Sequence, residues 1–259
     1  MDKIYIGTNW KMHKTIAEGR EYCKSLKELI KDRDKRMQLF IIPPYTSLVP
    51  LKEELDSSIL LGAQNMHWEE EGPFTGEISP AMLKEIGIDI VELGHSERRQ
   101  YYNENDCELN KKIKAAIKND LTPLLCIGEN KEQKAFGVSE ETLAIQLKTC
   151  LKGVTLEQAK RLWVAYEPVW AIGEGGTEAA PDYVHQMHGS IRKTLVGLFP
   201  EYGQNIPILF GGSVNITNAI AYLKGENVNG LFIGRSAWDL QKFAPILDEI
   251  EKFPQYSFQ

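Results

Sequence analysis

The chain has 259 residues, of which 42% are hydrophobic and 25% charged, and it contains 21 glycines. These proportions are those of a globular protein and exclude a disordered, fibrous or low-complexity chain. Thirty basic residues against 36 acidic ones give a net charge of −6. Such a balance creates no broad attraction to nucleic acid or to an anionic membrane, so neither is an expected partner.

The spacing of the cysteines and the length of the apolar runs indicate the cellular compartment of the protein. The four cysteines are widely spaced and do not cluster with histidines, which argues against a metal site or a disulfide framework. The first residues, MDKIYIGTNWKM, lack the apolar stretch of a secretion signal. The longest apolar runs, such as 39–42 and 124–127, are too short to span a bilayer. We therefore expect a soluble cytoplasmic protein.

Short apolar runs that end at polar or glycine positions recur along the chain. They predict buried strands near residues 4–7, 38–42, 59–64, 88–93, 121–127, 162–167, 206–210 and 230–233. Amphipathic stretches separate them, near 17–33, 47–56, 81–86, 140–152, 182–198, 217–224 and 240–252, with one more before the fifth strand. Thr15 with Glu18 is typical of a helix-capping box, and Ser79-Pro80 of a cap followed by a first-turn proline.

Strand and helix alternate in this way without any linker-like segment, which is typical of a parallel α/β fold. Eight repeats within about 250 residues favour a closed (β/α)8 barrel over an open sheet. An open doubly wound sheet would carry a glycine-rich dinucleotide fingerprint after its first strand, and IYIGTNWKM is not one. We therefore predict a single (β/α)8 TIM barrel of the α/β class, with residues 1–259 forming one domain.

Polar side chains follow three of the predicted strands at the ends where barrel active sites lie. Asn9 and Lys11 follow the first strand, His95 and Glu97 the fourth, and Glu167 the sixth. Exclusion of water would raise the pKa of Glu167 and suit it to act as a general base. A helix starting after His95 would favour the neutral imidazole, which can donate a hydrogen bond to a carbonyl oxygen. Lys11 would supply positive charge, with Glu97 as its partner.

Glycines follow the last two strands, as Gly211-Gly212-Ser213 and as Gly234. Loops in these places commonly bind phosphate, because bare backbone N–H groups and a helix N-terminus can face the anion. After Glu167, the segment 168–179 has two bulky residues followed by several glycines, a composition expected of a closing lid. Taken singly, each feature also has a structural explanation, a tight turn or a surface charge. Together they predict proton transfer beside a phosphate site.

Several motifs run in order through the chain: TNWKM at 8–12, GAQN at 62–65, FTGEIS at 74–79, ELGHSERR at 92–99, CIGE at 126–129, AYEPVWAIG at 165–173 and GGSV at 211–214. With these motifs the sequence closely resembles the triosephosphate isomerase family over essentially its full length. ELGHSERR and AYEPVWAIG are the most specific of them.

The resemblance implies a reaction and the residues that perform it. Glu167 would remove the proton beside the carbonyl group, and a neutral His95 would shuttle protons between the enediol oxygens, the roles for which this family is known. Lys11 and Asn9 would hold the substrate and stabilise negative charge, with Glu97 behind Lys11. The family's reaction needs no cofactor and no metal.

The resemblance also implies how substrate and partner bind. The phosphate of a small sugar phosphate would bind to backbone N–H groups of Gly173, Ser213, Gly234 and the neighbouring Arg235. Closure of the lid would keep water away from the enediolate. Members of the family are homodimers, and residues 74–77 resemble the loop that inserts beside the partner's Lys11.

Three positions depart from the family pattern. Glu174 stands in the lid where a hydroxyl is common, Phe210 lacks a tyrosine hydroxyl that helps to latch the lid, and Arg235 replaces the second of two glycines. The variant pattern resembles a branch of the family that interconverts L-erythrulose 1-phosphate and D-erythrulose 4-phosphate in erythritol catabolism. This tetrulose carries one hydroxymethyl group more than dihydroxyacetone phosphate, so the same base and electrophile would serve.

Two other functions stay open from the sequence. The chain could be a triosephosphate isomerase proper, which interconverts dihydroxyacetone phosphate and D-glyceraldehyde 3-phosphate in glycolysis and gluconeogenesis, if the Arg235 side chain points to solvent. It could also be a barrel without activity that serves as a scaffold, although the retained polar residues argue against this. A phosphate-binding barrel from amino-acid biosynthesis would not explain ELGHSERR and AYEPVWAIG together.

Overall fold

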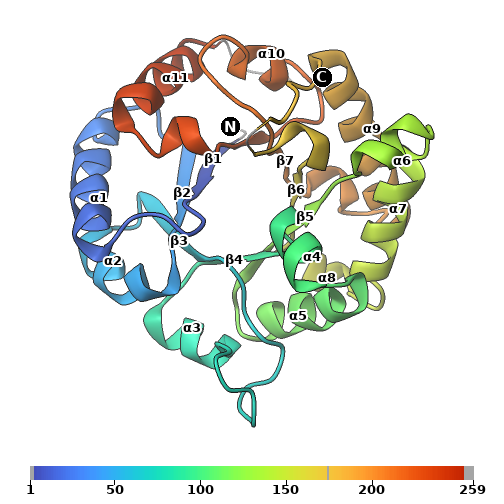
Figure 1. Ribbon diagram of the computed structural model, residues 1–259, viewed down its shortest axis with the longest axis horizontal. Helices are drawn as coiled ribbons and strands as arrows, with labels where there is room; N and C mark the ends of the chain where they lie inside the picture. The colour runs from blue at the N-terminus through green and yellow to red at the C-terminus, as the bar shows by residue number, and fades with distance from the viewer. Residues whose placement is uncertain (1–2, 174, 254–259) are drawn as a thin grey trace.

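The computed structural model describes residues 3–173 and 175–253. In this part of the chain, parallel strands close into an eight-stranded barrel in which β8 pairs with β1. The strands are β1 (Ile4–Asn9), β2 (Met37–Ile42), β3 (Ile59–Ala63), β4 (Ile90–Leu93), β5 (Thr122–Ile127), β6 (Trp163–Tyr166), β7 (Ile208–Phe210) and β8 (Gly230–Phe232). The helices form a ring around them (Figure 1). The predicted (β/α)8 barrel is confirmed.

Helices connect successive strands. The α-helices are α1 (Ile16–Ile30), α2 (Leu48–Glu54), α3 (Pro80–Ile86), α4 (Ser96–Tyr102), α5 (Asp106–Lys118), α6 (Lys131–Ala135), α7 (Ser139–Cys150), α8 (Leu156–Ala159), α9 (Pro181–Leu198), α10 (Ala219–Leu223) and α11 (Leu240–Lys252). Short 3-10 turns are η1 (Tyr45–Ser47), η2 (Val169–Ala171), η3 (Gly203–Asn205) and η4 (Arg235–Ala237). Across the described ranges, no helix combines the length and the apolar character that crossing a membrane requires.

Local sequence signals account for the element ends. Thr15 and Glu18 form the predicted capping box of α1, and Ser79 caps α3 with a proline in its first turn. β1 runs two residues further than the prediction, to Asn9, because Thr8 and Asn9 still pair with β2. β7 starts later than predicted, after Pro207, a residue that has no N–H group to donate to a strand ladder.

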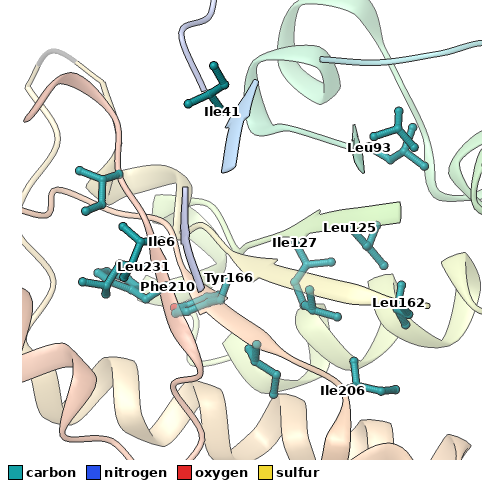
Figure 2. Packing of buried hydrophobic residues seen from close by; sticks show 14 of the residues in the cluster. Ile6, Ile41, Leu93, Leu125, Ile127, Leu162, Tyr166, Ile206, Phe210 and Leu231 are labelled. Atoms are coloured by element: carbon teal, nitrogen blue, oxygen red, sulfur yellow. The ribbon is translucent and has the colours of Figure 1, made fainter. Parts of the chain in front are cut away.

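Two layers of apolar side chains hold the barrel together. The interior layer consists of Phe40, Ile42, Ile90, Leu124, Cys126, Ala165, Leu209 and Phe232. A larger layer lies between strands and helices, and Figure 2 shows some of its members, including Tyr166 and Phe210. Successive residues of a strand point to opposite faces, so along β4 Ile90 points inward while Val91 and Leu93 point outward. The same alternation directs the last inward side chains of each strand toward the mouth of the barrel.

Candidate functional site

A cavity of about 50 Å³ lies at the C-terminal ends of the strands. It is lined by Asn9, Lys11, His95, Glu167, Ile172, Gly211, Gly212, Phe232, Ile233 and Gly234. The structure therefore brings together polar residues that the sequence placed after three separate strands. A larger cavity, of about 450 Å³, lies between the β3–α3 loop and helices α4 and α5, away from this cluster.

Glu167 follows β6, and its backbone N–H donates to the carbonyl oxygen of Ile127 at 2.7 Å. Its neighbour Gly211 has to be glycine, because a Cβ there would lie 2.8 Å from Cγ of Glu167. The carboxyl group is buried, and its Oε2 has no hydrogen-bond partner. Burial raises the pKa of Glu167, while His95 and Lys11 oppose the shift. A desolvated carboxylate with one unpartnered oxygen, in the wall of a cavity, is suited to accept a proton.

His95 is the N-cap residue of helix α4, the short helix that the sequence predicted after it. Its Nδ1 accepts a hydrogen bond from the backbone N–H of Glu97 at 3.2 Å. A ring nitrogen that accepts carries no proton, so this contact assigns the hydrogen of the neutral ring to Nε2. Nε2 lies 3.9 Å from Oε2 of Glu167. A hydrogen-bond donor and a base thus face one small space.

Lys11 has a backbone φ of 54°, an uncommon conformation for a residue with a side chain. Two contacts hold it: its N–H donates to Oδ1 of Asn9 at 2.6 Å, and its carbonyl oxygen accepts from Gln64 at 2.7 Å. Its Nζ forms the predicted ion pair with Glu97, at 2.6 Å from Oε1. The strained backbone places the charged group at the cavity, with Glu97 on its outer side.

Glu92 is a site residue that the sequence reasoning missed. It is completely buried on β4, where its Oε2 accepts from Nδ2 of Asn9 at 2.8 Å and its Oε1 accepts from Sγ of Cys126 at 3.7 Å. Burial and the charge of Glu167 raise the pKa of Glu92 well above its ordinary value. The signal was present: a glutamate at an inward position of the apolar run IDIVEL, three residues before His95.

Glu129 is a second residue missed, although the motif CIGE contains it. Its buried carboxyl group accepts hydrogen bonds from the Trp170 indole at 2.8 Å, the Tyr183 hydroxyl at 2.8 Å and the Tyr166 hydroxyl at 3.1 Å. The Nζ of Lys134 lies 3.2 Å from the centre of the Trp170 ring. These contacts fix the first turn of the predicted lid to the barrel.

The glycine-rich end of the cavity is where phosphate binding was predicted. Gly211, Gly212 and Gly234 line the cavity, whereas Ser213 and Gly173 are exposed and do not belong to its lining. The Arg235 side chain is exposed, but its Nη2 donates to the carbonyl oxygen of Gly173 at 3.3 Å. The guanidinium therefore lies against the lid, and Arg235 directly follows Gly234, which lines the cavity.

The other two departures from the family pattern have different outcomes. Phe210 is buried and packs against Tyr222, with ring centres 4.3 Å apart. The hydroxyl of Tyr222 donates to the carbonyl oxygen of Ala179 at 2.8 Å, so a tyrosine from α10 contacts the far end of the lid. Glu174 lies outside the described residues.

The acidic cluster could also hold a cation. Glu92, His95 and Glu167 each offer one ligand atom, and these atoms lie within 4.8 Å of one another. All three residues are buried, and two of them are already used in hydrogen bonds within the protein. The prediction that no metal and no cofactor are needed stays a prediction.

The arrangement is suited to moving a proton between adjacent carbon atoms, since the Glu167 carboxyl group and the His95 ring face each other beside a glycine-lined part of the cavity. A comparison with known families matches residues 4–250 to the family described as triosephosphate isomerase. The chain belongs to the triosephosphate isomerase family. It is therefore an isomerase of phosphorylated sugars, as the sequence resemblance implied.

Individual relatives point to one branch of this family. An L-erythrulose-1-phosphate isomerase of Rhizobium etli is 42% identical over 249 residues, which cover 95% of this chain and 92% of the relative. Proteins with the same name from Rhizobium meliloti, over 256 residues, and from Brucella abortus strain 2308, over 249 residues, are also 42% identical. These alignments cover 96% and 95% of this chain and 97% and 96% of the two relatives.

Proposed function

We propose that this isomerase interconverts L-erythrulose 1-phosphate and D-erythrulose 4-phosphate through an enediol intermediate. The observation that carries the substrate is the name shared by relatives that are 42% identical over some 95% of the chain. The convergence of base, donor and cation on one cavity supports an active enzyme rather than a scaffold. Triose phosphate interconversion is the alternative within the same chemistry.

In the proposed reaction the carbonyl group moves by one carbon. Glu167 takes the proton from the hydroxyl-bearing carbon next to the carbonyl, while His95 Nε2–H donates to the carbonyl oxygen. Lys11 and the second N–H of the Asn9 amide stabilise the negative charge that develops on the oxygens, with Glu97 holding Lys11. Glu167 then returns the proton to the former carbonyl carbon, and the proton balance is restored through His95.

We further propose that backbone N–H groups of Gly173, Ser213, Gly234 and Arg235 bind the phosphate when the lid closes. Ser213 and Gly173 stand just outside the cavity, so movement of the lid would have to bring them to the anion. The Arg235 guanidinium, next to Gly173, would then give a charge-assisted contact to the phosphate or hold the lid.

One preparation of the enzyme tests the substrate. We expect kcat/KM for L-erythrulose 1-phosphate to exceed that for D-glyceraldehyde 3-phosphate, since a pocket built for the larger sugar loses contacts with the smaller one. A single group of this size changes kcat/KM by about 10–200-fold. A Glu167→Gln preparation controls for host isomerase. More efficient turnover of the triose would assign the chain to glycolysis and gluconeogenesis, with the mechanism unchanged.

We also propose that the enzyme is a homodimer. The loop from β3 to α3 projects beyond the ring of helices (Figure 1) and carries the part-exposed Phe74. Met12, Tyr101 and Tyr102 are exposed large side chains that follow β1 and β4, whose ends surround the same rim. Exposed aromatic and apolar side chains beside a projecting loop would suit a protein–protein interface.

Shortening the 74–77 loop tests this proposal. We expect monomers with poor turnover, because the partner's loop would no longer support Lys11 from outside, in addition to the contacts that its backbone makes within its own chain. Light scattering and kinetics on the same sample measure both properties. Fully active monomers at the assay concentration would show that the site is complete within one chain.

Two broader proposals rest on simpler observations. Because β8 pairs with β1, the first and last strands close one barrel, which supports the prediction of a single domain over residues 1–259. The four cysteines are free, and Cys107 is exposed, which suits the reducing cytoplasm.

A further inference from the structure

Glu92 places a second carboxyl group directly beneath the base. It lies between the inward Ile90 and the end of β4, in a barrel interior that is otherwise largely apolar, and it is completely buried. A buried carboxyl group is costly unless it is hydrogen-bonded or neutral. We therefore expect the carboxyl group at position 92 to have a role that an apolar side chain could not fill.

The contacts of Glu92 lead to the substrate cavity through Asn9. Nδ2 of Asn9 donates to Oε2 of Glu92, while Oδ1 of Asn9 accepts from the backbone N–H of Lys11 and from Nε2 of Gln64, at 3.1 Å. With both ends of its amide engaged, Asn9 has one orientation. That orientation keeps its nitrogen toward Glu92 and its oxygen toward Lys11.

The charges around Glu92 decide its protonation. Oxygen atoms of Glu92 and Glu167 lie within 4.8 Å of each other, and both groups are buried. The other titratable groups that face this space are His95 after β4, Cys126 on β5 and Lys11 after β1. Lys11 already pairs with Glu97, farther out.

Two carboxyl groups this close and this buried bind one proton between them. Glu167 has to be ionised to act as a base, and His95 and Lys11 favour its charge. Glu92 is sealed beneath Asn9 and accepts hydrogen bonds from two neutral groups, the Asn9 amide and the Cys126 thiol, with no cation in hydrogen-bond contact within the described ranges. The shared proton therefore belongs on Glu92.

We propose that Glu92 is a positioning residue of this isomerase, which as a neutral carboxylic acid fixes the amide of Asn9 and leaves the single negative charge of the pair on Glu167. The negative charge of the enediolate then forms above a neutral group rather than above a second anion. A carboxylic acid kept neutral by an apolar site is an established device in enzymes that form enolates. The inference rests on the isomerase activity and not on the choice between tetrulose and triose.

Infrared spectroscopy of the full-length enzyme tests the protonation. At about pH 8, exposed carboxyl groups are ionised, so a protonated acid band in the wild type comes from a buried group. We expect this band in the wild type and in Glu167→Gln, and its loss in Glu92→Gln. Absence of the band from the wild type, or its persistence in Glu92→Gln, would overturn the proposal.

Kinetics test the positioning of Asn9, with whichever sugar phosphate the wild type turns over faster. Glu92→Leu leaves Nδ2 of Asn9 unpaired, and we expect kcat to fall about tenfold or more, with KM changing less. Glu92→Gln keeps an acceptor oxygen without charge and should restore kcat to within about threefold of the wild type. Equal kcat values for the two variants would contradict the role of Glu92 in holding Asn9.

Separate measurements distinguish a wrong substrate, a misfolded variant and a wrong role for Glu92. Relative kcat/KM values of the wild type for the two sugars decide the proposed substrate without any Glu92 variant. Thermal unfolding and circular dichroism establish that each variant is folded. If Glu92→Leu does not fold, the infrared comparison of wild type and Glu92→Gln still decides whether the buried acid is protonated.

Discussion

The two ends of the barrel bury charge in different ways. At the C-terminal end, Glu167 is buried with Oε2 unpartnered, facing the cavity. At the N-terminal end, the buried guanidinium of Arg192 donates to the carbonyl oxygens of Gly203 and Ile206 and to the side chains of Asn227 and Asn229.

This difference in hydrogen bonding distinguishes a group suited to catalysis from a group that stabilises the fold. Four hydrogen bonds to neutral oxygens satisfy Arg192, which has no carboxylate partner among the described residues, and burial lowers its pKa to about 10. In Glu167, by contrast, Oε2 accepts no hydrogen bond, so this oxygen is free to take a proton from the substrate. A substitution should therefore cost activity at one end and stability at the other.

The largest effect is expected for Glu167→Gln. This change keeps the shape of the side chain and removes the base, so kcat should fall by at least about 10²–10⁴. The melting temperature should not fall, because a buried charge is lost and no hydrogen bond to Oε2 is broken. Near-normal turnover in purified Glu167→Gln would rule out this residue as the base.

Arg192→Met tests the role of the buried guanidinium at the N-terminal end of the barrel. Loss of the guanidinium leaves several buried oxygens without donors, and the free energy of unfolding should decrease by about 2 kcal/mol or more. kcat per folded molecule should stay the same. Arg161→Met, at a half-exposed ion pair with Asp120, serves as the matched control and should change stability by less than about 1 kcal/mol. Equal effects of the two changes would refute the structural role of Arg192.

The stability of Glu92→Gln should depend on pH. The pKa of Glu92 is raised by burial and by Glu167, so the folded protein keeps a proton that the unfolded chain releases above the ordinary value of 4.5. The stabilisation from this proton is complete below that value and is lost as the pH rises toward the folded pKa. Glutamine does not titrate, so its melting temperature relative to the wild type should increase between about pH 5 and pH 8. A constant difference would mean that Glu92 is ionised when folded.

The smallest effect is expected for Arg235→Ala. The side chain is exposed and contributes one hydrogen bond to Gly173, so KM should rise about 2- to 10-fold with little loss of stability. Arg235→Lys keeps the positive charge but loses the planar guanidinium. A KM close to that of the wild type would indicate a contact with the phosphate, whereas a raised KM would indicate that the guanidinium has to hold the lid. An unchanged KM for both variants would place Arg235 outside the site.

Sequence reasoning predicted what depends on pattern and order. The alternation of apolar runs with amphipathic stretches predicted the barrel. The residues that follow the strands included Asn9, Lys11, His95 and Glu167, and they were predicted to form one site because the C-terminal ends of parallel strands meet at one rim. Glu92 was missed for a physical reason. Its importance arises from contacts with side chains on two other strands, and only the closed barrel reveals them.

The lid shows a similar limit. Its glycines and bulky residues were visible in the sequence, whereas the residues that hold it come from distant segments. Glu129 contacts it from the loop after β5, Tyr222 from α10 and Arg235 from η4. Such contacts depend on packing across the rim, which no local pattern encodes.

Hydrogen exchange measures proton transfer most directly. L-Erythrulose 1-phosphate is incubated with the enzyme in D₂O, and deuterium at the carbon next to the carbonyl group is followed by NMR. We expect deuterium in recovered substrate and in product with the wild type, and greatly reduced exchange with Glu167→Gln. Exchange at the same rate in both enzymes would contradict an enediol mechanism with Glu167 as the base.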